Sequence, residues 1–157
     1  MPERILDMEN IGRIGLMFID GDLLAKVLKD PYTCDEDDTN YDIPAFNCLK
    51  KALMKTERMN PDKYLTGVLW QRYPANKLMA SPAVAGKSMP WKSQSWMITK
   101  CAPALYEAME SDKLTSAEFS DGRRTLYFPV KSSSGEIVGA LELTEGAKPG
   151  AYEKTYA

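Results

Sequence analysis

Residues 124–144 read RTLYFPVKSSSGEIVGALELT, and this stretch decides the fold. Apolar residues alternate in its first part, as at Leu126 and Phe128, which predicts a strand with one buried face. A second apolar run, Ile137–Leu143, follows the serines and glycine of Ser132–Gly135, which are typical of a tight turn. The stretch therefore predicts an antiparallel hairpin at the end of a β-sheet.

The segments before this hairpin extend the same sheet. Thr115–Phe119 predicts a third strand, because Asp121-Gly122 is a hairpin turn signal between it and the next strand. Tyr64–Arg72 reads YLTGVLWQR and predicts a strand rich in β-forming residues, with Lys77–Ala80 as a short return strand. Ser81–Trp91 carries two prolines and a glycine, and we expect it to be irregular.

One helix separates the two groups of strands. Ser93 or Ser95 can cap a helix that runs to about Glu110, with apolar residues at helical spacing. The order strand, strand, helix and three antiparallel strands predicts an α+β fold, an antiparallel meander sheet with helices packed on one face.

Residues 1–60 predict a mainly helical N-terminal extension. Helices are expected over Glu3–Gly12, Leu23–Lys29 and Pro44–Arg58, where apolar residues recur at helical spacing. The run RIGLMFID at Arg13–Asp20 favours a short buried strand, with a buried helical turn as the alternative.

The charge also divides unevenly along the chain. Residues 1–60 have a net charge of −4 and residues 61–157 a net charge of +2. Together with the predicted elements, this asymmetry indicates an extension over 1–60, a folded domain over 61–145 and a flexible tail over 146–157.

Composition excludes several classes of function. A chain of 157 residues can bury a core without a metal or disulfide, and a net charge of −2 gives no basic footprint for nucleic acid. With no histidine, the chain has no Ser-His-Asp triad and no histidine ligand for zinc or haem. No leader and no apolar run approaching 18 residues is visible, so we expect a cytoplasmic protein that binds no membrane.

Two further features offer sites only as alternatives. The acidic stretch 35–42 could bind Ca²⁺ or Mg²⁺, although an EF-hand starting at Asp38 would need glycine at position 43 and glutamate at position 49, where Ile43 and Leu49 stand. A solvated acidic loop is the other reading, and we assign no metal site. Cys48 lies on an apolar helix, and we expect it in the core.

We assign no catalytic residue. The groups available for catalysis are carboxylates, lysines, tyrosines and cysteines, and they show no paired-carboxylate or Ser-x-x-Lys pattern. Carboxylate spacing in the fold is not readable from sequence, so a small enzyme with carboxylate or cysteine chemistry stays an alternative.

Two motifs resemble a PAS sensor domain. MASPAVAGKS at residues 79–88 is similar to the segment after the first PAS hairpin, and residues 124–144 are similar to the closing PAS hairpin. The resemblance covers about residues 63–145 and is closest to the PAS domains found beside hemerythrin-like domains. Those domains carry Cys-His-Pro where this chain has Ser88-Met89-Pro90-Trp91. Related GAF and Cache sensor folds have similar closing hairpins.

The resemblance implies a non-catalytic sensory or regulatory domain. Such domains bind haem, flavin or a small organic ligand between sheet and helices, or bind none and pair with a second copy, so the cofactor stays unassigned. We expect action through homodimerisation, with residues 1–60 as the contact, or through docking to a signalling partner. A ligand-free adaptor is the other alternative.

Aromatic and methionine side chains are abundant for so small a sheet, and they either fill the core or line a ligand pocket. The residues that we predict to line such a pocket are Trp70, Met79, Trp96, Phe119, Tyr127 and Leu141.

Overall fold

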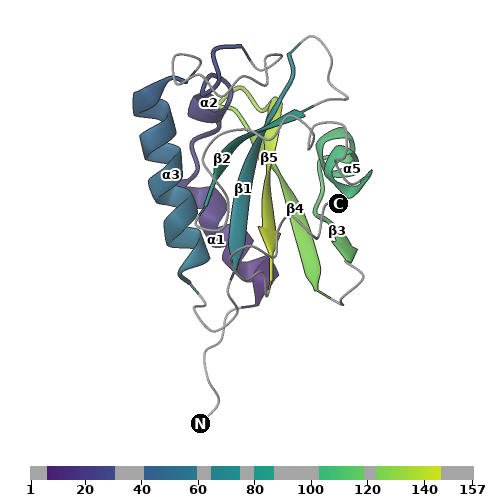
Figure 1. Cartoon of the computed structure of the whole chain (residues 1–157). Coiled ribbons are helices and arrows are strands. Elements are labelled where there is room, and N and C mark those ends of the chain that lie inside the picture. Colours follow the sequence, from purple (N-terminus) through teal and green to yellow (C-terminus); the bar gives the residue numbers. More distant parts are fainter. Residues whose placement is uncertain are drawn as a thin grey trace.

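The computed structural model describes residues 7–30, 41–59, 65–74, 80–86, 103–118 and 123–145. Its elements follow one another along the chain and are shown in Figure 1. The helices are α1 (Met8–Phe18), α2 (Gly21–Leu24), α3 (Ile43–Glu57) and α5 (Pro103–Ser111). The strands are β1 (Thr66–Arg72), β2 (Ala80–Ala85), β3 (Thr115–Glu118), β4 (Arg124–Lys131) and β5 (Ile137–Thr144).

The five strands form one antiparallel sheet in the order β2-β1-β5-β4-β3. The α+β class with an antiparallel sheet is therefore confirmed. β4 and β5 form the closing hairpin where the alternation of apolar residues predicts it, and β1 and β3 fall within their predicted ranges.

Helices cover both faces of this sheet, because the helices of the predicted N-terminal extension lie on the face opposite to α5. α1, α2 and α3 share an apolar cluster with one face, and α5 packs on the other face (Figure 1). The reason lies in the strands, because β1 is buried at all but its last residue and β5 is buried over its last six residues. Strands buried on both faces need a cover on both sides.

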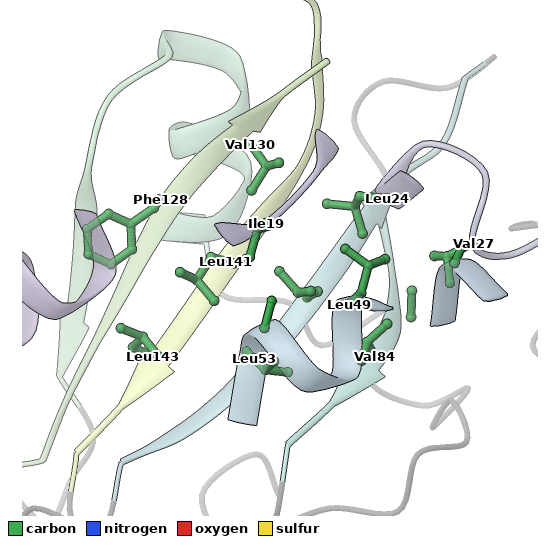
Figure 2. Packing of buried hydrophobic residues seen from close by; sticks show 14 of the residues in the cluster. Ile19, Leu24, Val27, Leu49, Leu53, Val84, Phe128, Val130, Leu141 and Leu143 are labelled. Carbon is green, nitrogen blue, oxygen red and sulfur yellow. The ribbon is translucent and has the colours of Figure 1, made fainter. Parts of the chain in front are cut away.

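The larger cluster fills the space between the sheet and the N-terminal helices. Leu49 and Leu53 of α3 and Leu24 of α2 point toward apolar residues of the sheet, among them Leu141 and Leu143 of β5 (Figure 2). The predicted helix over Pro44–Arg58 is confirmed as α3. The division into an extension over 1–60 and a domain over 61–145 stays a prediction.

The expectation of a strand over Arg13–Asp20 is wrong, because most of this run belongs to α1. Asp7 caps the helix by accepting a hydrogen bond from the Asn10 backbone N–H at 2.8 Å. The buried residues of the helix are spaced at helical intervals and include Gly12 and Gly15. Two glycines on the buried face obscure the apolar period from which a helix is recognised.

The expectation of irregular structure from Ser81 onward is also wrong, because β2 runs over Ala80–Ala85. β2 is an edge strand, and its Pro82 lies opposite Trp70, next to a register shift in the ladder. Proline is tolerated at an edge strand or a bulge, since it has no N–H to donate to a second neighbour.

Other predictions fall partly outside the described residues. These include the start of the helix at Ser93 or Ser95, the return strand before residue 80, the tail 146–157 and the acidic residues 35–40. Asp42, the last residue of the acidic stretch, is among the described residues. It caps α3 by accepting a hydrogen bond from the Ala45 N–H at 3.2 Å. Cys48 is exposed on α3, so its expected place in the core is wrong.

α1 approaches the sheet most closely at Gly12. A Cβ atom on Gly12 would overlap the ring of Phe128 on β4. Phe128 is itself buried, so the ring has little room to move. The helix therefore reaches this distance from the sheet only with glycine at this position.

We predict that Gly12→Ala destabilises the fold by about 1–3 kcal/mol, even though alanine favours helix by about 1 kcal/mol. Urea unfolding followed by circular dichroism measures the change. In a Phe128→Leu background, which shortens the opposing side chain, the same substitution should cost less. An equal cost in both backgrounds would contradict the contact as the cause.

Charged side chains join α3 to the sheet near the start of β1 and the end of β2. The buried Glu57 accepts a hydrogen bond from the Gly67 N–H at 2.6 Å. Lys50 donates to the carbonyl oxygens of Ala85 and, at 3.1 Å, Gly86. Burial lowers the pKa of Lys50, and the negative charge of Glu57 opposes that shift. The lysine therefore offsets part of the charge of the buried carboxylate.

We predict that Lys50→Met lowers the unfolding free energy by about 1–3 kcal/mol, because it leaves a buried carboxylate without its nearby cation. In a Glu57→Gln background the same change should cost less, so the double-mutant cycle should show coupling. Lys51→Met, on the exposed side of α3, is the matched control and should have little effect. Additive costs for the two substitutions would show that the charges act independently.

Candidate functional site

The structure separates the residues that we predict to line a ligand pocket. Trp70 of β1 and Tyr127 of β4 lie on the face of the sheet that α5 covers. Leu141 of β5 lies on the opposite face, among the N-terminal helices (Figure 2). The structure therefore does not bring Leu141 together with Trp70 and Tyr127. Met79, Trp96 and Phe119 lie outside the described residues.

The face toward α5, which we call the α5 face, has an apolar centre. Trp70 and Tyr127 are its two large aromatic residues, and both are buried. The cluster consists of Val68, Trp70, Ala80, Ala104, Leu105, Ala108, Met109, Tyr127 and Ala140. Small alanines on β5 and α5 allow the helix to approach the sheet closely.

Polar side chains continue the α5 face toward the other end of the strands. Glu142 of β5 lies in register between Val68 and Tyr127, and it is fully buried. One pair further along, Thr144 lies between Thr66 of β1 and Thr125 of β4, and these three threonines are buried as well. Since alternate residues share a face, all four polar residues belong to the α5 face.

The hydrogen bonds of this polar group are incomplete. Thr125 Oγ1 donates to the Leu143 carbonyl oxygen at 3.0 Å, and the Thr125 and Thr144 hydroxyls share a hydrogen bond of 2.9 Å. The Thr66 hydroxyl and the Trp70 indole N–H are buried without a hydrogen-bond partner. Buried polar groups are nearly always paired, so these two atoms mark a place where a bound molecule could donate and accept hydrogen bonds.

The α5 face thus combines an aromatic wall with a buried carboxylate and hydroxyls. Such a surface can bind a small molecule that has an apolar part and a few polar atoms. Among the described residues, no group of three or more His, Cys, Asp or Glu side chains could hold a metal ion. No helix in the described part of the chain is long and apolar enough to cross a membrane.

Sequence reasoning found the aromatic part of this face but missed its polar part. Glu142 and Thr144 stand in GALELT, where a carboxylate alternates with leucines and suggests an exposed strand face. Their burial follows from the pairing of β5 with β1 on one side and β4 on the other, which no property of these residues indicates. Thr66 gives no sequence signal, because threonine is common in ordinary strands.

Comparisons with known proteins give a match among solved structures. No family model matches the chain, and no curated protein matches it. Among solved structures, the chain is similar to the GAF domain of A. aeolicus nlh2, solved in an inactive state, with 12% sequence identity and a TM-score of 0.46. The match covers 92% of this chain and 88% of that chain.

Proposed function

We propose that this protein is a non-catalytic sensory or regulatory domain that binds a small organic molecule against the α5 face. The supporting observation is the pair of buried, unpartnered polar atoms, Thr66 Oγ1 and Trp70 Nε1, beside the buried Glu142. The resemblance of residues 63–145 to PAS domains, including those beside hemerythrin-like domains, belongs to the same proposal. We further propose that the domain works in the cytoplasm and passes its state to a partner protein.

The α5 face sets the chemistry of the proposed ligand. Trp70 and Tyr127 offer flat apolar surface, while the Trp70 indole can only donate a hydrogen bond and the Thr66 hydroxyl can donate or accept. A ligand with an aromatic or aliphatic body and at least one acceptor atom satisfies both groups. Binding would remove the cost of leaving them buried and unpaired, about 1–3 kcal/mol for each group.

Native mass spectrometry of freshly purified full-length protein, with an absorption spectrum, tests for such a ligand. We expect an added small-molecule mass in stoichiometric amount, and Trp70 predicts a change in tryptophan fluorescence when the molecule is removed. A bare chain that also binds nothing from a metabolite extract would favour the ligand-free adaptor. Turnover of a bound molecule would instead favour the small enzyme.

We predict that Thr66→Val has opposite effects on stability and on ligand retention. Valine removes a hydroxyl that has no partner, so the ligand-free chain should be equally stable or more stable. The same change should reduce the amount of co-purified ligand. Thermal unfolding and native mass spectrometry measure the two effects.

Thr56→Val is the matched control for this substitution. Thr56 is also a buried threonine, but its hydroxyl donates to the Ala52 carbonyl oxygen at 2.9 Å on α3. Its loss should cost about 1 kcal/mol and leave ligand retention unchanged. Equal retention in Thr66→Val and the wild type would contradict a ligand at the α5 face.

We also propose that the domain forms a homodimer through α1. Met17 and Phe18 at the end of α1 are large apolar residues with 81% and 53% of their surface exposed. Exposed apolar residues on a helix are suited to contact with a second copy. Residues 1–60 contain this helix, which agrees with their expected role in dimerisation.

We predict that Met17→Glu combined with Phe18→Glu shifts the protein from dimer to monomer without unfolding it. Native mass spectrometry over a range of protein concentrations measures the mass, and circular dichroism monitors the fold. Glu9→Gln on the same helix is the control. A wild-type protein that is monomeric at all concentrations would contradict the dimer and leave docking to a different protein.

A further inference from the structure

A cavity of about 220 Å³ lies at one end of the sheet, between the end of β1 and the start of β5. Its lining includes Ala25 after α2, Arg72 and Tyr73 at the end of β1, and Glu136, Ile137 and Val138 at the start of β5. None of these residues is among those that sequence reasoning assigned to a pocket. The cavity is smaller than the sites of drug-sized ligands, which measure roughly 300–1,000 Å³.

The cavity exists because two neighbouring strands separate. The ladder between β1 and β5 ends at the pair Gln71–Gly139, although both strands continue beyond it. On one side, Arg72 goes on to pair with Ala80 of β2; on the other, Ile137 pairs with Lys131 of β4. The space between the separated strands is therefore built into the strand pairing.

An irregularity in β5 brings apolar side chains to this space. A register shift follows Val130 of β4, so Val138 is an extra residue between two paired positions. Alternation from Ala140 would place Val138 on the α5 face. Instead Val138 packs in the larger cluster and Ile137 packs in the cluster of the α5 face, and both line the cavity. Bulges of this kind often redirect side chains beside binding sites.

The cavity also carries one charge of each sign. The Arg72 side chain is 10% exposed and donates to Glu110 of α5 at 3.1 Å, while the Glu110 side chain is 50% exposed. A guanidinium has five N–H donors in a planar fork, so one arginine can contact more than one carboxylate at the same time. Glu136 lies at the exposed rim. The apolar Ile137 and Val138 follow it directly along the chain.

We propose that this cavity binds a small zwitterion, a free amino acid with an apolar side chain. Its carboxylate would pair with Arg72, its ammonium would face Glu136, and its side chain would contact Ile137, Val138 and Tyr73. A ligand that carries only a negative charge would be repelled by Glu136, and one that carries only a positive charge would be repelled by Arg72. Neither therefore fits as well as a molecule with both charges. A cavity of about 220 Å³ limits the ligand to a molecule about as large as a free amino acid.

This site is separate from the proposed site on the α5 face. It uses the separated ends of β1 and β5, whereas the unpartnered Thr66 lies at the opposite end of β1. The inference therefore does not rest on the proposed function. Thr66→Val serves as a control that should leave amino-acid binding unchanged.

Isothermal titration calorimetry of the full chain with leucine tests the proposal. Two analogues separate the charges: 4-methylpentanoate lacks the ammonium group, and 3-methylbutylamine lacks the carboxylate. We expect one leucine to bind per chain with micromolar to millimolar affinity, and both analogues to bind more weakly. Absence of saturable binding of leucine at millimolar concentration would overturn the proposal, as would equal affinity for 4-methylpentanoate.

Three substitutions place the binding at the cavity. Arg72→Gln should weaken leucine binding about tenfold or more, since hydrogen bonds to charged groups contribute strongly. Glu136→Gln should weaken it about two- to fivefold, because exposed charge pairs contribute less. Ala25→Leu fills the cavity from an exposed position without changing any charge, and it should abolish binding.

Glu110→Gln distinguishes ligand binding from a structural role of Arg72. It removes the same ion pair as Arg72→Gln but keeps the guanidinium. If Arg72 binds the carboxylate of leucine, Glu110→Gln should keep or raise the affinity. An equal loss in the two variants, or unchanged binding in both Arg72→Gln and Ala25→Leu, would overturn the assignment.

Discussion

The pairing of β1 with β5 is the constraint on which the rest of the structure depends. It joins segments about seventy residues apart, from Thr66–Thr144 to Gln71–Gly139, and so unites the β1–β2 hairpin with the β3–β4–β5 meander. Close approach of the two strands requires Gly139, because a Cβ atom there would strike the Trp70 carbonyl oxygen. Once they are paired, β1 and β5 are central strands of the sheet. Both faces of these strands then need a helical cover.

The two faces meet this requirement differently. Toward the N-terminal helices the sheet presents mainly leucine, valine and phenylalanine around Leu49 and Leu53 (Figure 2). The buried Gln71 also points to this side and donates to the Ala25 carbonyl oxygen at 2.9 Å. Toward α5 the same strands present Glu142 and three threonines beyond the aromatic pair. Both faces therefore bury polar side chains, and such burial costs free energy unless the side chain is hydrogen-bonded. Glu57 and Gln71 on the side of the N-terminal helices are hydrogen-bonded, whereas Thr66 Oγ1 on the α5 face is buried without a hydrogen-bond partner.

Local patterns were sufficient for the elements that depend on local sequence. The alternation in residues 124–144 and the Asp42-Ile43-Pro44 start of α3 predicted β4, β5 and α3. The predictions failed where a distant contact decides. Gly15, in the run that favoured a strand, is buried against Thr56 of α3, and Pro82 is accommodated by an edge strand. The same distinction applies to the candidate site. Aromatic residues indicate burial by their own chemistry, whereas the sheet face on which Leu141 and Glu142 lie is set by the pairing of β5 with β1 and β4.

If a molecule binds the α5 face as proposed, the unpartnered atoms there would connect its binding to the stability of the fold. Two buried polar groups at about 1–3 kcal/mol each are a substantial part of a net stability of about 5–15 kcal/mol for a domain. A molecule that satisfies them binds only the folded state, so it stabilises that state by RT ln(1 + [L]/Kd). Under this proposal the stability of the fold should depend on ligand occupancy more strongly than in a domain whose buried side chains are all hydrogen-bonded. Because α5 packs on the same face, the helix is the element through which occupancy would become visible at the surface.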